Sequence, residues 1–253
     1  MNPDDIIVAS LPVKLFGRAF AFDVSMTLAG TWIVMAFIFV FFRHVTRNFS
    51  PDFRMTRMQG ALEAVVIFFR DQVESMTGRR AGGVLYLVMS LFVFILVANW
   101  SALLPIPFPV EGGTRWYAPP TASLSTAAAL AIVVMCSVVF YGVRGKSLGG
   151  YLGKFFEPVF VLLPINVLGD LSNGMSLAVR LYGNVMSAQM LVGMLFAFAP
   201  FVLPGLMGIF GLVSGTIQPY IFATLAAVYI SAGLGEATDS EREELERLRL
   251  QRV

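Results

Sequence analysis

Long apolar runs bounded by short charged segments dominate this chain. A transmembrane helix needs roughly 20 mostly apolar residues. Runs of that length predict three such helices, over residues 24–42, 84–104 and 121–141.

A longer apolar stretch follows, and only two charged residues, Asp170 and Arg180, interrupt it. Proline breaks helices because it lacks a backbone N–H and its ring clashes with the preceding turn. Pro200 and Pro204 therefore divide the stretch into two long helices, over 158–199 and 201–235. We predict an all-α polytopic membrane protein whose three transmembrane helices are followed by a long two-helix hairpin, in a single membrane domain.

Residues 53–77 differ from the spans because their apolar positions recur at helical spacing, with charges elsewhere on the helix. The apolar positions are Met58, Leu62, Val65, Val66, Phe69 and Val73. This pattern is typical of a helix that lies at the membrane interface. We therefore predict an interfacial amphipathic helix here.

The composition agrees with a chain that lies in a lipid bilayer. Its 253 residues are 57% hydrophobic and 13% charged, whereas a soluble domain is about 25% charged. Too few polar residues are present to cover a soluble surface, which excludes a disordered chain and an ordinary soluble enzyme. The single Cys136 excludes an intrachain disulfide, and a net charge of +2 without a basic stripe indicates no nucleic-acid partner.

The distribution of Lys and Arg predicts the orientation, because cytoplasmic loops carry an excess of both. Such residues gather after the first and third predicted spans, whereas the loop before the third has Arg115 alone. We therefore expect the N-terminus outside (periplasmic) and, after five crossings, the charged tail 236–253 in the cytoplasm. The absence of a transit peptide favours a bacterial cell inner membrane.

Arg180 lies in the middle of a long apolar helix, where inserting an Arg into the membrane costs about 2.5–3.5 kcal/mol of free energy. We therefore expect Arg180 to face protein or water and not lipid. At about 100° per residue, a face about 80° wide follows roughly six turns of this helix. The polar residues on that face are Asn166, Asn173, Ser176, Arg180, Asn184 and Ser187. Asp170 lies at its edge and Gln189 on the opposite side. This polar stripe favours a partly hydrated path or a polar seam against another protein surface; the alternative is an Arg that only fixes helix packing.

The last predicted helix carries a smaller polar set within about 60° of one another around the helix, namely Ser214, Gln218 and Tyr229. Gln218 precedes Pro219, where a kink would free a backbone carbonyl. The single histidine, His44, lies just beyond a span end, and no zinc-spaced cluster, Cys–His pair or phosphate-binding loop is present. We therefore expect a non-enzyme without a metal or cofactor.

Four pieces of the sequence carry a resemblance to a known family. They are NWSALLPI at 99–106, PPTASLSTAAALA at 119–131, LPINVLGDLSNGMSLAVRLYGN at 163–184 and IQPYIFATLAAVYIS at 217–231. The chain resembles subunit a of the membrane sector of rotary F-type ATP synthases over most of its length. The Arg-Leu-aromatic-Gly-Asn piece, with a Gln one helix later, is the most specific element.

This resemblance implies that the two long helices form a tilted hairpin against a rotating ring of c subunits, each with a mid-membrane carboxylate. Two aqueous half-channels would reach the ring from opposite sides, with Arg180 between them. Its charge would favour the ionised carboxylate and repel cations that leak directly. The subunit would couple proton flow to ring rotation and to ATP synthesis or hydrolysis. The other implied partners are the b-subunit peripheral stalk and the remainder of the complex.

Individual residues carry over from the family to this chain. Arg180 matches the essential Arg, and Asn184 matches the half-channel Asn. Ser176 matches a small polar position one turn earlier, and Asp170, where relatives often have Glu, would line the exit half-channel. Gln218 matches the Gln thought to contact the Arg.

The chain also departs from the family pattern. Gln189 and Gly211 replace a Glu and a His that relatives often pair in the inlet half-channel, so neither position titrates. Ser123 stands where many relatives have an acidic residue, and Asn173 and Gly174 replace a Lys-Pro pair. These departures resemble the alternate, N-type branch of F-type ATPases and favour sodium as an alternative coupling ion.

Two other functions remain open from the sequence. Arg180 is also compatible with a secondary transporter of an anionic solute, although the inverted repeats typical of such proteins are not found. A purely structural membrane anchor is the third hypothesis. Uptake of solute by the isolated chain would favour the transporter, and normal ion flux after Arg180→Ala would favour the anchor.

Overall fold

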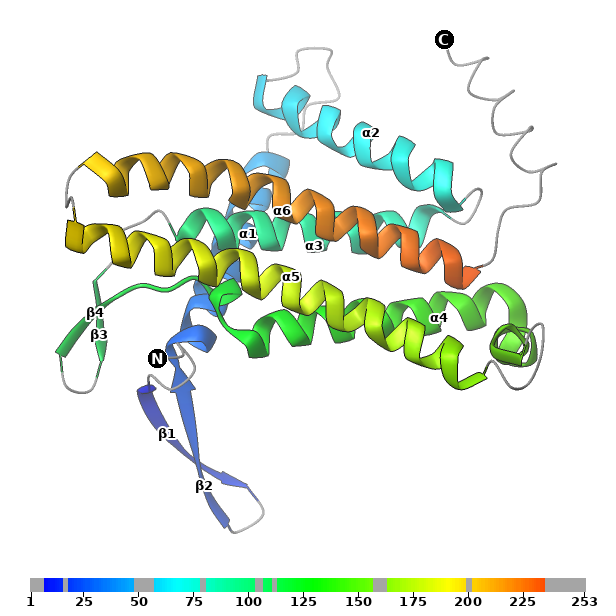
Figure 1. Ribbon diagram of the computed structural model, residues 1–253, viewed down its shortest axis with the longest axis horizontal. Helices are drawn as coiled ribbons and strands as arrows, with labels where there is room; N and C mark the ends of the chain where they lie inside the picture. The colour runs from blue at the N-terminus through cyan, green and yellow to red at the C-terminus, as the bar shows by residue number, and fades with distance from the viewer. Residues whose placement is uncertain are drawn as a thin grey trace. The chain divides into compact units, whose positions relative to one another are not determined.

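A computed structural model describes residues 7–15, 18–47, 57–77, 81–102, 107–110, 113–156, 163–198 and 202–234. Most of these residues are helical (Figure 1). The helices are α1 (Met26–Arg47), α2 (Arg57–Thr77), α3 (Ala81–Ser101), α4 (Leu124–Phe156), α5 (Leu163–Phe198) and α6 (Val202–Leu234). The predicted all-α polytopic class is thus confirmed, while the predicted tail 236–253 lies outside the described residues.

Two short antiparallel hairpins are additions that the apolar pattern does not predict. β1 (Ile7–Leu15) pairs with β2 (Arg18–Ser25), and β3 (Pro107–Val110) pairs with β4 (Gly113–Trp116). In β2 the larger side chains alternate with smaller ones, which is the period of a strand. The first span therefore begins later than predicted, at Met26, and the hydroxyl of Ser25 accepts a hydrogen bond from the Leu28 amide in the first turn.

Four helical segments in the described part of the chain are long and apolar enough to cross a membrane. They are Met26–Val45, Gly82–Ser101, Leu124–Arg144 and Gly208–Leu234. α2, which was predicted to lie at the interface, is not among them. α5 is not in this set either, and its sequence contains Asp170, Arg180 and several Asn and Ser residues.

Prolines mark the ends of the two long helices. α5 begins at Leu163 with Pro164 in its first turn, and α6 begins at Val202 with Pro204 in its first turn. Proline is tolerated at these positions because the first amides of a helix have no intrahelical acceptor. α4 continues to Phe156, well beyond the end predicted at residue 141. Pro219 alone lies inside α6.

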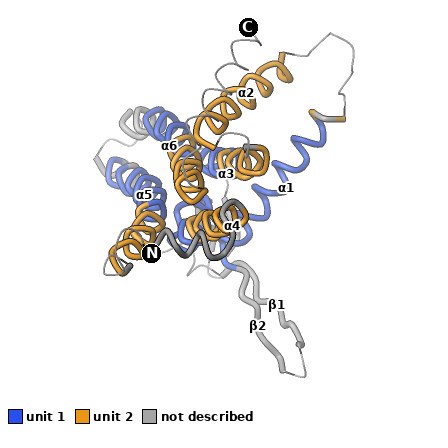
Figure 2. Tube along the Cα trace, turned by 90° about the vertical axis from the view of Figure 1, so that its right-hand side faces the viewer, with its two compact units in different colours: residues 1–44, 93–130, 177–219 blue, residues 45–92, 131–176, 220–253 orange. Residues whose placement is uncertain are grey.

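The chain divides into two compact units, and α5 and α6 each contribute to both (Figure 2). The first unit contains residues 1–44, 93–130 and 177–219, and the second contains 45–92, 131–176 and 220–253. Each has its own buried apolar residues. Ile95, Leu177 and Leu181 belong to the first unit, whereas Phe69 and Phe222 belong to the second.

In the second unit, one face of α2 is anchored by aromatic and polar contacts. The ring of Phe69 lies 4.7 Å from that of Phe92 and 6.1 Å from that of Tyr220. The side-chain amide of Gln72 donates to the Tyr220 hydroxyl at 3.2 Å, and the Ser231 hydroxyl donates to the Met76 carbonyl. α2 is therefore fixed along the side that carries these residues.

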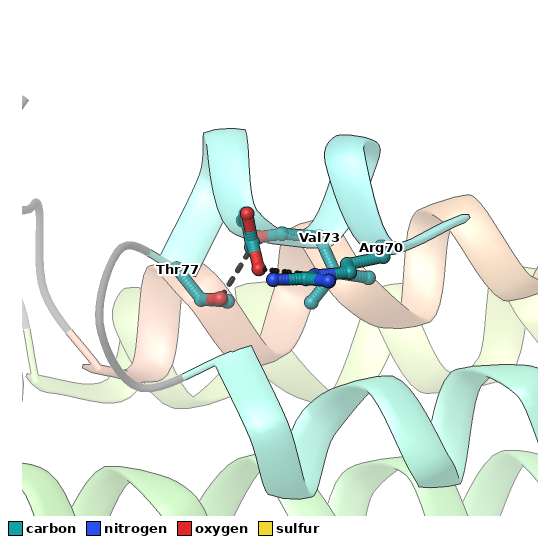
Figure 3. A network of polar contacts seen from close by, with 4 residues as sticks. Arg70, Val73 and Thr77 are labelled. Carbon is teal, nitrogen blue, oxygen red and sulfur yellow. Dashed lines mark hydrogen bonds and ion pairs between the residues drawn. The ribbon is translucent and has the colours of Figure 1, made fainter. Parts of the chain in front are cut away.

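The predicted apolar face of α2 is only partly buried, because Val65 and Val66 on that face stay exposed, as does the neighbouring Phe68. Arg70 forms a 2.7 Å ion pair with Glu74 on the same helix, and the Thr77 hydroxyl donates to the Val73 carbonyl (Figure 3). The hydrogen bond from Arg70 to Glu74 raises the pKa of the Arg70 guanidinium.

Candidate functional site

Arg180 lies on the exposed side of α5 in the first unit. Its neighbours along the helix, Leu177, Ala178 and Leu181, are buried and direct the opposite side of α5 into the protein. No described side chain forms a hydrogen bond or ion pair with the Arg180 guanidinium. The residue therefore presents an exposed positive charge that no described side chain of this chain compensates.

Asn184 lies one turn after Arg180 and connects α5 to α6 within the first unit. The hydroxyl of Ser214 donates a hydrogen bond of 2.8 Å to the Asn184 side-chain oxygen. A Cβ added at Gly183 or at Gly211 would meet no atom within 4 Å. The Asn184–Ser214 bond thus lies near two positions that have open space around them.

Gln218 is buried, with 5% of its surface exposed, and its side-chain Nε2 has no hydrogen-bond partner among the described residues. No hydrogen bond joins the described side chains of Gln218 and Arg180, for which the family resemblance implies a contact. A buried amide without a partner costs about 1–3 kcal/mol. Such a cost is typical of a group that meets water or another subunit in the working assembly.

The remaining residues of the polar stripe have different surroundings. In the first unit, the exposed Ser187 donates its hydroxyl to the Gly183 carbonyl of the same helix, and Gln189 is half-buried. In the second unit, Asn166, Asn173 and Asp170 are half-buried and Ser176 is exposed. Both units therefore carry stripe residues that are at least partly accessible.

A polar cluster in the first unit was not predicted as part of the site. Asn99, near the end of α3, is 7% exposed, and its side-chain nitrogen donates to the Gly215 carbonyl of α6 at 3.2 Å. Thr121, in a 3-10 turn over Pro120–Ala122, is fully buried and donates its hydroxyl to the Asn99 side-chain oxygen at 2.8 Å. An asparagine inside an apolar span is the signal that could have found this cluster.

Two further contacts flank the cluster. The Trp100 indole nitrogen donates to the Thr216 hydroxyl at 3.0 Å. The hydroxyls of Ser101 and Tyr117 lie 3.1 Å apart. Burial raises the pKa of Tyr117, and its hydrogen bond with Ser101 offsets part of that rise. The Tyr117 hydroxyl therefore keeps its proton across the neutral range.

Ser123, one of the positions at which the sequence departs from the expected family pattern, is fully buried before α4. Its hydroxyl lies 2.6 Å from that of Ser125, and its carbonyl accepts the Ala127 amide at 3.1 Å. Among the described residues, no group of three or more His, Cys, Asp or Glu side chains could hold a metal ion.

The fold and the site define a multi-pass membrane protein with a charged arginine on the polar face of a long helix. The sequence matches the ATP synthase A chain family over residues 28–231, and the chain belongs to this family. It is a non-catalytic membrane subunit of a rotary F-type ATP synthase, and its partners are the rest of that complex.

Individual relatives agree with this family over nearly their whole length. The chain is 41% identical to ATP synthase subunit a 2 of Acaryochloris marina over 211 residues, which cover 83% of this chain and 86% of the relative. It is 37% identical to ATP synthase subunit a of Albidiferax ferrireducens, covering 92% of this chain and 93% of the relative. It is 35% identical to ATP synthase subunit a 1 of Prosthecochloris aestuarii, covering 92% of this chain and 96% of the relative.

Proposed function

We propose that this chain is the ion-translocating stator subunit of its complex and that it forms two half-channels against a ring of c subunits. Arg180 separates the half-channels, and Asn184, Gln218, Asp170, Ser176 and Gln189 contribute to the ion path. Asn166, Asn173 and Ser187 extend the polar stripe beside it. Ion flow between the half-channels turns the ring and drives ATP synthesis or hydrolysis. The b-subunit peripheral stalk holds this subunit still.

The exposure of Arg180 is the observation that carries this proposal. An arginine facing lipid costs about 2.5–3.5 kcal/mol on insertion scales, and no described residue of this chain neutralises its charge. A neighbouring subunit with a carboxylate at the same depth supplies the missing partner. A charge near that carboxylate favours its ionised form and hence release of the bound ion.

The contact between Asn184 and Ser214 supports a polar path beside Arg180. It connects the two long helices one turn away from the charge, and Gly211 leaves open space one turn along α6. Polar side chains of this kind, beside small residues, allow water to enter between membrane helices. Protons move along such water without a titratable side chain in every position.

The coupling ion in this proposal is the proton, with sodium as the alternative. Gln189 and Gly211 remove the titratable pair of the inlet half-channel. That departure favours membership of the N-type branch and, with it, sodium coupling. A secondary transporter of an anionic solute is a remote alternative, because membership of the ATP synthase A chain family favours a rotary complex.

The proposed orientation places the N-terminus outside, in the periplasm, and the C-terminus in the cytoplasm of a bacterial inner membrane. The support for it is the excess of Arg and Lys after the first and third spans.

The test is ATP-driven ion uptake into vesicles that hold the whole complex, with and without sodium and with a protonophore. Acidification that needs no sodium and vanishes with the protonophore would establish proton coupling. Sodium accumulation that survives the protonophore would establish the sodium alternative and assign the Gln189 and Gly211 departures to it. An assembled, ATP-hydrolysing complex that moves neither ion would contradict the proposed function.

A further inference from the structure

Pro219 removes one backbone hydrogen bond from the middle of α6. In an α-helix the amide of residue 219 would donate to the carbonyl of residue 215. Proline has no amide hydrogen, so the Gly215 carbonyl loses its helical donor. In a membrane interior such a carbonyl needs another partner, because an unpaired backbone group there costs several kcal/mol.

Asn99 supplies that partner from α3 in the same compact unit. Its side-chain nitrogen lies 3.2 Å from the Gly215 carbonyl oxygen. The carbonyl can only accept, so the NH₂ group of Asn99 must face it and the side-chain oxygen must face the other way. Thr121 donates its hydroxyl to that oxygen at 2.8 Å, which fixes the amide in the required orientation.

The close fit at Gly215 agrees with a dedicated contact. A Cβ added to Gly215 would lie 3.4 Å from the Cβ of Asn99, which is van der Waals contact, so α3 and α6 lie close together at this position. Asn99 and Thr121 are 7% and 0% exposed. The neighbouring bond from Trp100 to Thr216 is different, because Trp100 is 47% exposed and its acceptor is a side-chain hydroxyl and not the backbone carbonyl that the proline frees.

We propose that Asn99 and Thr121 are positioning residues for ion translocation, which replace the hydrogen bond lost at Pro219 and thereby set the position of Gln218. Gln218 adjoins Pro219, and its buried side-chain nitrogen has no partner among the described residues. Its placement therefore depends on how α6 is held at the proline. This inference rests on the proposed role of α6 in the ion path.

The test is a double-mutant cycle in the whole complex, measuring ATP-driven ion uptake per assembled complex in vesicles. Asn99→Ala should lower uptake at least tenfold in the natural background. In the Pro219→Ala background the backbone amide at position 219 again donates to Gly215, so Asn99→Ala should lower uptake less than threefold there. Equal losses in the two backgrounds would overturn the proposal.

A second pair of variants keeps the test decisive if Pro219→Ala prevents assembly. Thr121→Val removes the hydroxyl but keeps the shape, and it should reproduce most of the Asn99→Ala loss. Thr121→Ser keeps the hydroxyl and should restore uptake to within twofold of the natural complex. If Thr121→Ser is as impaired as Thr121→Val, the hydroxyl has no positioning role and the proposal is wrong.

Two controls separate this inference from the proposed function. Trp100→Phe removes the neighbouring contact, which does not involve the carbonyl freed by the proline, and should change uptake by the same small factor in both backgrounds. Arg180→Ala should abolish uptake whatever the state of Asn99. If uptake survives Arg180→Ala, the proposed function fails. If Arg180→Ala abolishes uptake but Asn99→Ala causes the same loss in both backgrounds, only the positioning role fails.

Discussion

At the scale of single residues, the Ser214 hydroxyl controls the orientation of Asn184. Ser214→Ala removes the only described donor to the Asn184 side-chain oxygen, so we expect coupled ion uptake to fall several-fold, in line with about 0.5–1.5 kcal/mol for a neutral hydrogen bond. Ser214→Thr keeps a hydroxyl and should retain most of the uptake. The measurement is uptake per assembled complex in vesicles.

Ser137→Ala is the matched control, because the Ser137 hydroxyl donates to the Val133 carbonyl of its own helix. This variant should leave uptake unchanged. A loss equal to that of Ser214→Ala would show that removing any serine hydroxyl is harmful and would contradict a particular role for the Asn184 contact.

The sequence predicts which residues carry polar chemistry better than it predicts their partners. Arg180 and Asn184 are evident from their place in an apolar helix, and Gln218 from its position before Pro219. The sequence also indicates that Pro219 frees a carbonyl, yet it gives no sign that Asn99 binds that carbonyl. Helical periodicity relates residues on one helix, whereas this contact joins two helices more than a hundred residues apart in the chain.

At the scale of elements, the hydrogen bond from Gln72 to Tyr220 holds α2 to α6, and its loss should lower the stability of the subunit. Tyr220→Phe leaves the Gln72 side-chain nitrogen without its acceptor, and the Gln72 side-chain oxygen already has no partner among the described residues. We expect a destabilisation of about 1–3 kcal/mol. The measurement is the temperature at which this subunit is released when the purified complex is heated.

The double variant Gln72→Leu/Tyr220→Phe replaces both partners with apolar groups. It should recover much of the stability lost in Tyr220→Phe, because no amide is then left buried and unpaired. A double variant less stable than either single variant would contradict this account of how α2 is anchored.

Helix packing in the second unit depends on Gly233 of α6. A Cβ added there would lie 3.1 Å from both Cγ1 and the backbone oxygen of Val138 in α4. The backbone oxygen cannot move away easily, so Gly233→Val should overpack this contact and destabilise the folded subunit by about 1–3 kcal/mol. The amount of this subunit in detergent-extracted complex, measured by immunoblot, should fall.

Gly82→Val provides the comparison, because a Cβ at Gly82 of α3 would meet no atom within 4 Å. Both variants place a β-branched residue in a helix, so their intrinsic helix penalties are alike. Equal amounts of subunit in the two variants would contradict the close α4–α6 contact at Val138.

Helix boundaries show where the sequence pattern stops being informative. Apolar run length predicts the cores of α1, α3 and α4, but α4 extends to Phe156 through a glycine-rich, charged segment that has no membrane-like hydropathy. The hairpin β1–β2 includes residues 24 and 25, which the sequence predicts as the start of the first span. Backbone pairing of this kind depends on a partner strand, which a single apolar run does not reveal.

At the scale of the whole molecule, five predicted membrane elements correspond to four helices that satisfy length and hydropathy alone, together with α5. α5 is the helix whose polar stripe makes it less apolar than a simple span. Its exposed Arg180 and half-buried asparagines need a protein neighbour, and membership of the ATP synthase A chain family gives the chain such neighbours.

In the proposed mechanism, the charge of Arg180 couples ion movement to the rest of the complex. The most direct measurement is ATP-driven ion uptake by vesicles that contain fully assembled Arg180→Ala complex, with assembly verified by immunoblot of every subunit. We expect no uptake in this variant, while ATP hydrolysis by the catalytic part remains measurable. Uptake at the natural rate by an assembled Arg180→Ala complex would contradict the account.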